Sequence, residues 1–437
     1  MTRCRATRSP AGAAFGPFGQ RTSRAGRGFP ERKPGNASRM RLNHLIAGVL
    51  LLGIADSMIG PYLVLFGADE ANLSPFQVGV FVSLIAASGL VVSTWLGRRY
   101  DRSEGRWPAV VAVTAPAVGY LVLTVTTDYV LLLLVAIGFL GAGMAAFPQL
   151  FSLARTHLAT GPAAARGNPV LRSVWSLAWA IGPLLGAVVL AWQGYRGLLL
   201  VTAAVFVLVL VPLAALGHTA PGPAREPTGT PGTERHRWTR PVLLAVASYT
   251  LFHTAMLSGS VALPLYVTRT LDLSDSDVGL LFSVCAFVEV PAALGLLLLP
   301  ARMRKRPLIL AGMLLFVAYF VMVAASSTLA ALVATQVARG VAIAVVGALG
   351  ITYVQDLLPT APGRATALFA NTLTTGSLIS GVLAGAVAQT LGYQAALLLC
   401  GGLAALGAAL LAVSGPEDRA TAVPAPEAGA ATVLATD

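Results

Sequence analysis

Four ionisable side chains stand inside long apolar segments of the sequence. Asp56 lies in GIADSMIG, Glu289 in CAFVEVPAAL, Arg339 in QVARGVAI and His253 in LFHTAML. An ionised group at the centre of a bilayer costs at least about 2.5 to 3.5 kcal/mol, so such residues usually face a cavity in the protein. A carboxyl group in such a cavity can bind and release a proton within the physiological pH range. We therefore predict that these four residues take part in proton coupling.

Each of the four also has a purely structural interpretation. Asp56 would be a hydrogen-bonding partner inside the protein, Glu289 and Arg339 would form a permanent pair, and His253 would be a satisfied core histidine. For His253 the structural interpretation is the favoured one. For Asp56 and Glu289 function is favoured, because no structural need places a carboxylate there.

The composition places these residues in a membrane. Of the 437 residues, 56% are hydrophobic and 11% are charged, which is too apolar for a soluble globular protein. A helix needs roughly 20 apolar residues to cross the hydrocarbon core, and such stretches recur along the chain. We predict an all-α membrane protein with twelve transmembrane helices. The predicted spans are Leu42–Phe66, Phe76–Leu96, Pro108–Thr126, Tyr129–Leu153, Val170–Trp192, Gly197–Leu216, Val242–Val267, Val278–Leu299, Leu308–Ala325, Leu329–Leu357, Ala365–Thr390 and Tyr393–Val413.

The charges between the spans predict the orientation. With a cytoplasmic N-terminus, the inward connections carry sixteen Lys or Arg residues, and the outward connections carry only Arg196 and Arg269. Because cytoplasmic connections are enriched in basic residues, we predict a multi-pass protein of the cytoplasmic (plasma) membrane with both termini cytoplasmic. The net charge of +12 predicts no nucleic-acid partner, since residues 1–39 carry nine Lys or Arg residues against one acid.

Polar segments divide the chain. Residues 1–39 are basic and poor in large apolar residues, so they predict a disordered leader; Met40 also resembles a natural start, and this alternative stays open. Residues 217–240 are rich in Pro, Gly, Thr and Arg and predict a cytoplasmic linker. Residues 415–437 predict a disordered tail. The predicted six-helix halves are 40–216 and 241–414.

The two halves resemble each other in sequence. NLSPFQVGVFVS from Asn72 and DLSDSDVGLLFS from Asp272 share residues at a constant offset of 200. GPLLGAVVLAWQGY and GVLAGAVAQTLGY, near the ends of spans five and eleven, share a glycine pair four residues apart and a closing Gly-Tyr. This six-plus-six arrangement resembles the major facilitator superfamily. The resemblance implies the major facilitator fold, with substrate bound near the midplane between halves that rock to alternate access.

The segment GRRYDRSEGR between spans two and three resembles the signature loop of that superfamily. Gly97, Asp101 and Arg102 are in register with it, whereas Gly105 and Arg106 stand one residue late. The resemblance implies that Gly97, Asp101 and Arg102 belong to a cytoplasmic latch. Ordinary anchoring of the membrane ends would account for the arginines but not for the aspartate.

Span five contains residues that tend to break helices. Gly182, Pro183 and Gly186 form a G-P-x-x-G patch, which resembles the fifth-helix motif of antiporters in the superfamily, although Ala178 stands where a glycine is usual. Small residues let transmembrane helices pack closely, and neighbouring helices supply partners for the freed backbone. The patch predicts close packing of this helix, with a simple kink as the alternative.

A more specific resemblance covers most of the chain. FPQLFSLARTH, LRSVWSLAWAIGP and DLLPTAPGRATALFANTLTTGSLISG resemble the bacterial sugar efflux transporter (SET) family. This resemblance implies export of small sugars or glycosides in exchange for protons. Sugar recognition needs hydrogen-bonding groups and an apolar ring face, and Trp175 and Trp179 share one helix face. The substrate-binding candidates are Tyr62, Gln149, Trp175, Ser176, Trp179, Gln355 and Asn371.

Other functions are less well supported. A multidrug exporter of the same superfamily stays an alternative, because Asp56 and Glu289 suit cationic drugs. A non-transporting membrane sensor is the alternative of another class. We predict no enzyme, cofactor or metal site, since the sequence has no G-x-x-x-x-G-K-[ST] motif and no Cys or His cluster with ligand spacing. The predicted partners are a small-molecule substrate, protons and the lipid bilayer, and the chain is predicted to be a monomer.

Overall fold

A computed structural model describes residues 36–103, 105–157, 162–216, 239–300 and 303–414. Within these ranges the structure is helical and has no β-strand, so the predicted all-α class is confirmed. Ten helices are long and apolar enough to cross a membrane. Most of the predicted leader, most of the predicted linker and the whole predicted tail lie outside the described residues.

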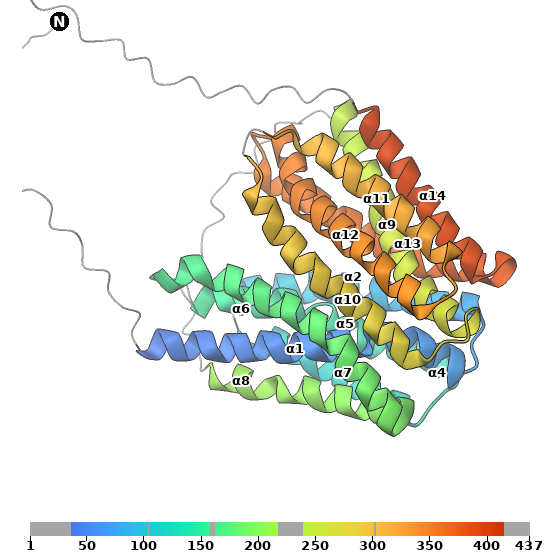
Figure 1. The fold of residues 1–437 in the computed structure, drawn as a ribbon. Coiled ribbons are helices and arrows are strands. Elements are labelled where there is room, and N and C mark those ends of the chain that lie inside the picture. Colours follow the sequence, from blue (N-terminus) through green and yellow to red (C-terminus); the bar gives the residue numbers. More distant parts are fainter. Residues whose placement is uncertain (1–35, 104, 158–161, 217–238, 301–302, 415–437) are drawn as a thin grey trace, which may run out of the picture.

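The helices form two groups in chain order (Figure 1). The first group contains α1 (Asn36–Asp69), α2 (Pro75–Ser103), α3 (Trp107–Leu123), α4 (Tyr129–Val135), the π-helix η1 (Ala136–Leu140), α5 (Gly141–Gly143), α6 (Ala146–His157), α7 (Pro162–Leu208) and α8 (Leu210–Ala215). The second contains α9 (Arg240–Arg269), α10 (Asp275–Gly295), the 3₁₀ turn η2 (Leu296–Leu298), α11 (Lys305–Ala325), α12 (Leu329–Leu357), α13 (Pro362–Leu391) and α14 (Tyr393–Ala412).

The predicted number of spans and the ten candidate helices differ at two places. The helix that corresponds to the third predicted span, α3, has 17 residues, which is short for a membrane span. The fifth predicted span and most of the sixth lie within α7, in which two helices meet at Gly194, a residue with non-helical angles between the predicted ends Trp192 and Gly197. Gly194 has a φ of 64°, a left-handed angle that glycine adopts without a steric penalty. Twelve spans therefore stay a prediction.

The internal repeat also appears in local backbone structure. Asn72 and Asp272 lie in equivalent turns and have φ angles of 50° and 53°, a left-handed conformation that Asn and Asp tolerate better than most residues. Asp128 and Thr328 are N-caps of equivalent helices, and each side chain accepts a hydrogen bond from the backbone N–H three residues later. Both pairs keep the offset of 200 residues seen in the sequence.

Arg106 and Arg306 are a third equivalent pair, again 200 residues apart. Arg106 donates from Nη1 to the carbonyl of Ala214 at 3.1 Å, and Arg306 donates from Nη2 to the carbonyl of Leu411 at 3.0 Å. Each arginine thus satisfies a free carbonyl at the end of α8 or α14, where a cation also interacts favourably with the helix dipole.

The two helix groups meet at one end and diverge toward the ends where α1 and α9 begin (Figure 1). At the meeting end, small residues allow backbone contact. A Cβ atom on Gly79 of α2 would lie 2.8 Å from the carbonyl carbon of Gly381 in α13, and one on Gly279 of α10 would lie 2.5 Å from the carbonyl oxygen of Pro183 in α7. The groups therefore contact each other through α2 with α13 and through α7 with α10.

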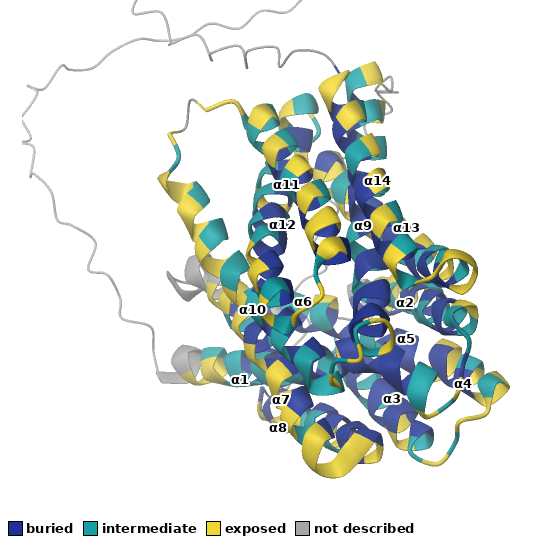
Figure 2. Ribbon diagram, turned by 45° about the vertical axis from the view of Figure 1, so that its right-hand side comes forward, coloured by how far each residue is buried: buried dark blue, intermediate teal, exposed yellow. Residues whose placement is uncertain are grey.

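The outer faces of the helices carry many exposed residues (Figure 2), and many of these are large and apolar. Trp192, Leu297 and Leu298 are 82%, 79% and 87% exposed. Apolar helix faces of this kind suit a lipid environment, in which only helices with internally satisfied backbones are stable.

Candidate functional site

A cavity of about 490 Å³ lies between the two helix groups. Residues of α1, α2 and α7, with Met144 at the end of α5, line one side, and residues of α9, α10, α12 and α13 line the other. Most of the lining is apolar, as in typical small-molecule sites of this size. The residues with polar side-chain groups are Trp179, Ser260, Glu289, Arg339, Ser377 and Ser380, besides the thiol of Cys285.

Arg339 supplies the positive charge of this cavity. Its Nη2 donates to Ser260 Oγ at 2.9 Å, and its Nη1 donates to Gln336 Oε1 at 3.4 Å. Its guanidinium carbon lies 4.7 Å from the ring centroid of Phe282, a distance that allows a cation–π interaction. These contacts fix the guanidinium group against α9 and α10.

Glu289 lines the same cavity from α10 and is half-buried. Within the part of the chain that the structure describes, no carboxylate lies within ion-pair distance of Arg339. The permanent Glu289–Arg339 pair considered above is therefore not formed in this conformation. The two charges share one cavity and interact at longer range.

Trp179 is the predicted substrate-binding residue that reaches the cavity. Its indole Nε1 is buried and has no hydrogen-bond partner among the described residues. Trp175, four residues earlier, packs instead against Phe147, with ring centroids 4.4 Å apart. The predicted tryptophan pair thus has one member at the cavity and one in the helix packing.

Asp56 and His253 lie outside the cavity lining. Asp56 is half-buried in α1, within electrostatic range of Tyr120 in α3. His253 is buried, and its Nδ1 lies 2.9 Å from Thr372 Oγ1. Its ring also makes an edge contact with Phe369, with centroids 5.4 Å apart. His253 thus has the surroundings of a hydrogen-bonded core histidine.

The other predicted substrate-binding residues also lie outside the cavity lining. Tyr62 donates to a carbonyl of α7 at 2.9 Å, and Ser176 donates to a carbonyl of its own helix at 3.2 Å. Gln355 donates to a threonine of α13 at 3.0 Å. Gln149 is buried, with its Oε1 unpaired among the described residues, and Asn371 is exposed on α13. In this conformation, Tyr62, Ser176 and Gln355 connect or stabilise helices.

The G-P-x-x-G patch of α7 packs against α1. A Cβ atom on Gly182 would lie 3.2 Å from the backbone nitrogen of Met58, and one on Gly186 would lie 2.7 Å from Cε2 of Tyr62. Real Cβ atoms almost never approach other atoms as closely as 2.7 Å. Gly182 and Gly186 thus lie close to α1, and the role of Gly182, Pro183 and Gly186 as a packing motif stays a prediction.

The predicted latch lies at the end of α2. Gly97 has open space around the position of a Cβ atom. The side chains of Asp101 and Arg102 lie outside the described residues, so their role in a latch stays a prediction.

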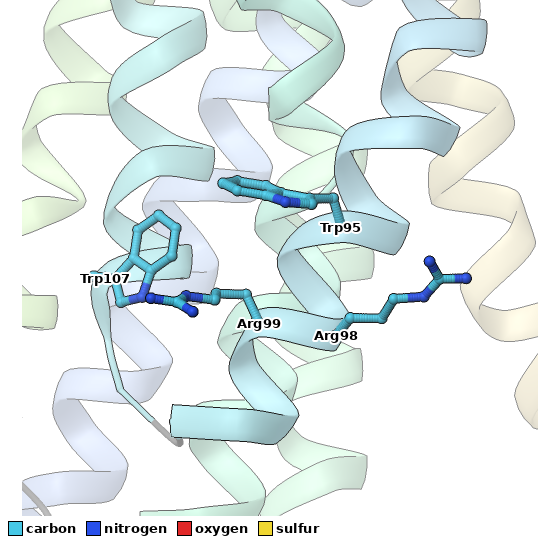
Figure 3. Close-up of a pocket in the computed structure, with 4 residues that line it drawn as sticks. All are labelled: Trp95, Arg98, Arg99 and Trp107. Carbon is cyan, nitrogen blue, oxygen red and sulfur yellow. The ribbon is translucent and has the colours of Figure 1, made fainter.

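A smaller surface pocket of about 340 Å³ adjoins this end of α2. Arg99 reaches toward the indole ring of Trp107, whereas Arg98 points away (Figure 3). The guanidinium carbon of Arg99 is 5.9 Å from the Trp107 ring centroid, and the two indole centroids are 5.8 Å apart. Trp and Arg together are typical anchors at a membrane interface, and here they join α2 to α3.

Sequence reasoning missed the serines of the cavity and Phe282. A serine in an apolar span is a weak signal, because its hydroxyl can bond to its own helix, as Ser260 does to the Met256 carbonyl at 3.0 Å. Phe282 is one of many apolar residues in α10. Only the packing of α10 against α12 shows that its ring covers Arg339.

The fold and the cavity define a membrane transporter of two helix bundles, and comparison with known proteins identifies its family. The sequence profile of the Major Facilitator Superfamily matches residues 45–305 and 252–436. The chain therefore belongs to the Major Facilitator Superfamily.

Within the superfamily, proteins named as sugar efflux transporters are similar to this chain. A Deinococcus radiodurans protein assigned as a sugar efflux transporter is 37% identical over 382 residues, which cover 85% of this chain and 98% of that protein. Sugar efflux transporter A of Escherichia coli is 31% identical over 366 residues, which cover 81% of this chain and 92% of that protein. The resemblance to sugar efflux transporters is thus confirmed.

Solved structures support the fold alone. The nucleoside transporter NupG is 14% identical, with a TM-score of 0.71 over 87% of this chain and 99% of that chain. A bacterial homologue of the lysosomal transporter Spinster, in an inward-facing and unoccupied conformation, is 13% identical, with a TM-score of 0.70 over 87% of this chain and 98% of that chain.

Proposed function

We propose that this protein exports small sugars or glycosides across the cytoplasmic membrane in exchange for protons. The observation that carries this proposal is the cavity between the two helix groups, which contains a carboxyl group and a guanidinium group that do not pair with each other. A site at the interface of two six-helix halves is where transporters of this architecture bind their substrates. The names of the relatives add the substrate class.

Sugar binding requires directional hydrogen bonds and an apolar surface. Arg339 offers several N–H donors in a rigid plane, and its contacts with Ser260 and Gln336 hold that plane in place. The unpaired indole N–H of Trp179 is a further donor. A buried unpaired donor costs about 1 to 3 kcal/mol, so a substrate hydroxyl that accepts from it is stabilised.

Glu289 is the proposed coupling residue. When ionised it accepts hydrogen bonds from sugar hydroxyl groups, and when protonated it loses both its charge and part of its accepting capacity. Protonation from the outer side therefore favours sugar release, and deprotonation on the inner side restores the sugar site. This competition exchanges one sugar for one proton. Asp56 stays a second candidate from the first helix group.

The conformation fits one stage of such a cycle. We infer that the meeting end of the two helix groups faces outward and the diverging end faces the cytoplasm, because the basic connections predict cytoplasmic termini. Alternating access then requires the meeting end to open and the diverging end to close.

The test is counterflow in proteoliposomes with a panel of labelled sugars and cationic dyes. We expect labelled sugar to accumulate transiently against unlabelled internal sugar, and an imposed pH gradient to drive net uphill movement. The mostly apolar lining of the cavity would also suit lipophilic drugs. Accumulation of dyes but not sugars would therefore support a multidrug exporter instead. Binding of sugar without any transport would support the membrane sensor.

A further inference from the structure

Four polar side chains lie together where the two helix groups meet, away from the central cavity. This meeting end is the closed end of the molecule. They are Asp69 at the end of α1, Tyr195 just after the kink of α7, Arg269 at the end of α9 and Asp275 at the start of α10. Tyr195 Oη lies 2.7 Å from Asp69 Oδ2 and 2.8 Å from Asp275 Oδ2. Arg269 pairs with the other oxygen of Asp69. The cluster joins the two helix groups, since Asp69 and Tyr195 belong to the first and Arg269 and Asp275 to the second.

The two hydrogen bonds to Tyr195 need more protons than the phenol has. A phenol carries one O–H, and an ionised carboxylate can only accept. If both carboxylates were ionised, one oxygen pair at hydrogen-bond distance would have no proton between its members, and this contact would be repulsive. The arrangement therefore requires one additional proton.

Arg269 decides which carboxyl group holds that proton. Its guanidinium group pairs with Asp69 and not with Asp275, so a proton on Asp275 leaves this ion pair intact. The proton therefore resides on Asp275, whose O–H donates to Tyr195 Oη, while the Tyr195 O–H donates to Asp69. The other titratable side chains that interact with this cluster are Tyr62 of α1 and Tyr393 of α14.

We propose that Asp69, Tyr195 and Asp275 form a proton-binding site that exists only while this end of the transporter is closed. Closing brings the two carboxyl groups together through Tyr195, and a proton from the water at that end binds to Asp275. Opening separates the helix groups, exposes both carboxyl groups to water and releases the proton there. The site is distinct from Glu289 and couples the conformation of the transporter, rather than sugar binding, to the pH at that end.

The test measures conformation directly and uses neither sugar nor a gradient. Spin labels are attached to Glu70→Cys and Thr270→Cys, exposed positions on the two sides of the closed end. The protein also carries Glu289→Gln, so that the cavity carboxyl group does not titrate, and Ala in place of its native cysteines. The native cysteines are Cys4, Cys285 and Cys400. Pulsed electron paramagnetic resonance then gives the closed and open populations between about pH 8 and pH 5.

Uptake of one proton on closing changes the ratio of closed to open molecules by up to about tenfold per pH unit. We expect this ratio to rise as the pH falls, with a slope that approaches about tenfold per pH unit. Asp275→Asn should abolish the slope and keep the closed population high at every pH, because the amide N–H₂ donates permanently to Tyr195. Tyr195→Phe should lower the closed population at pH 5, because it removes the bridge.

Asp272→Asn is the matched control. Asp272 lies three residues before Asp275, on the exposed turn that precedes α10, and its left-handed backbone tolerates Asn. This variant removes a charge but no contact of the cluster, so the slope should persist. A ratio that does not change with pH, a slope retained in Asp275→Asn, or a slope lost in Asp272→Asn would each overturn the proposal. Because sugar is absent, these outcomes do not depend on the proposed transport function.

Discussion

The most informative single substitution is Glu289→Gln, because it separates sugar binding from proton coupling. Glutamine keeps the size of the side chain and one carbonyl acceptor, but it cannot exchange a proton. The position of Arg339 depends on Ser260, Gln336 and Phe282 rather than on Glu289. We therefore expect the cavity to keep its shape and sugar-for-sugar exchange to persist in the variant, at a higher sugar concentration because the neutral amide resembles the protonated, sugar-releasing form of Glu289.

The expected size of the effect follows from the gradient. One pH unit corresponds to about 1.4 kcal/mol per proton. With one proton exchanged per sugar, a gradient of two pH units can sustain a sugar concentration ratio of about 100. If Glu289 is the coupling residue, Glu289→Gln should reduce this ratio to about 1, whereas Glu289→Asp should keep part of the accumulation.

Both assays are performed on one reconstituted sample, so that loss of folded protein affects both equally. Loss of exchange together with uphill transport would mean that Glu289 is needed for binding or folding. Asp56→Asn is tested in parallel, because Asp56 is the alternative carboxyl group. If both amide variants still concentrate sugar about 100-fold, neither residue is the coupling acid, and the reasoning from the cavity is refuted.

Three further predictions concern packing, His253 and the start of the chain. Gly186→Val should cost about 1 to 3 kcal/mol of stability through overpacking and abolish most transport while the protein stays in the membrane. The control Gly347→Ala, at a helical glycine with open space, should do neither. Unchanged efflux by Gly186→Val would mean that the G-P-x-x-G patch has no role in transport. His253→Gln should retain pH-driven export, because the ring bonds to Thr372 away from the cavity, and loss of the drive with exchange intact would restore His253 as a proton carrier. A chain that starts at Met40 should insert and transport normally, as membrane fractionation and counterflow would show; failure to insert would contradict the disordered leader.

The apolar spans and the similarity of the two halves could be predicted from the sequence. These features depend on residue type and local spacing, as the repeated segments from Asn72 and Asp272 illustrate. The left-handed backbone angles of these two residues were not predicted. The break in α7 at Gly194 lies between the predicted ends of the fifth and sixth spans, but the left-handed backbone angle of Gly194 was not predicted. The π-helix at Ala136–Leu140 was also missed, since its residues do not differ in type from those of an ordinary apolar helix.

The side chains that face the cavity were harder to predict. In a soluble helix the polar face marks the solvent side, but in a membrane both the lipid face and the packed face are apolar. Asp56 and Glu289 therefore look equivalent in the sequence, although only Glu289 lines the cavity. The same ambiguity explains why Trp179 reaches the cavity whereas Trp175, on the same helix face, packs against Phe147.

The contacts between the two helix groups fit the proposed alternation of the site between the two sides of the membrane. Gly79 against Gly381 and Gly279 against Pro183 are backbone contacts in equivalent parts of the repeat. Contacts of this kind contain few interlocking side chains, so one helix group can rotate on the other without repacking its own core. The hydrogen bonds of Tyr195 to Asp69 and Asp275 are different, because they are directional and break when the groups separate. In the proposed cycle, the glycine contacts permit the movement, and the polar cluster determines when the closed end opens.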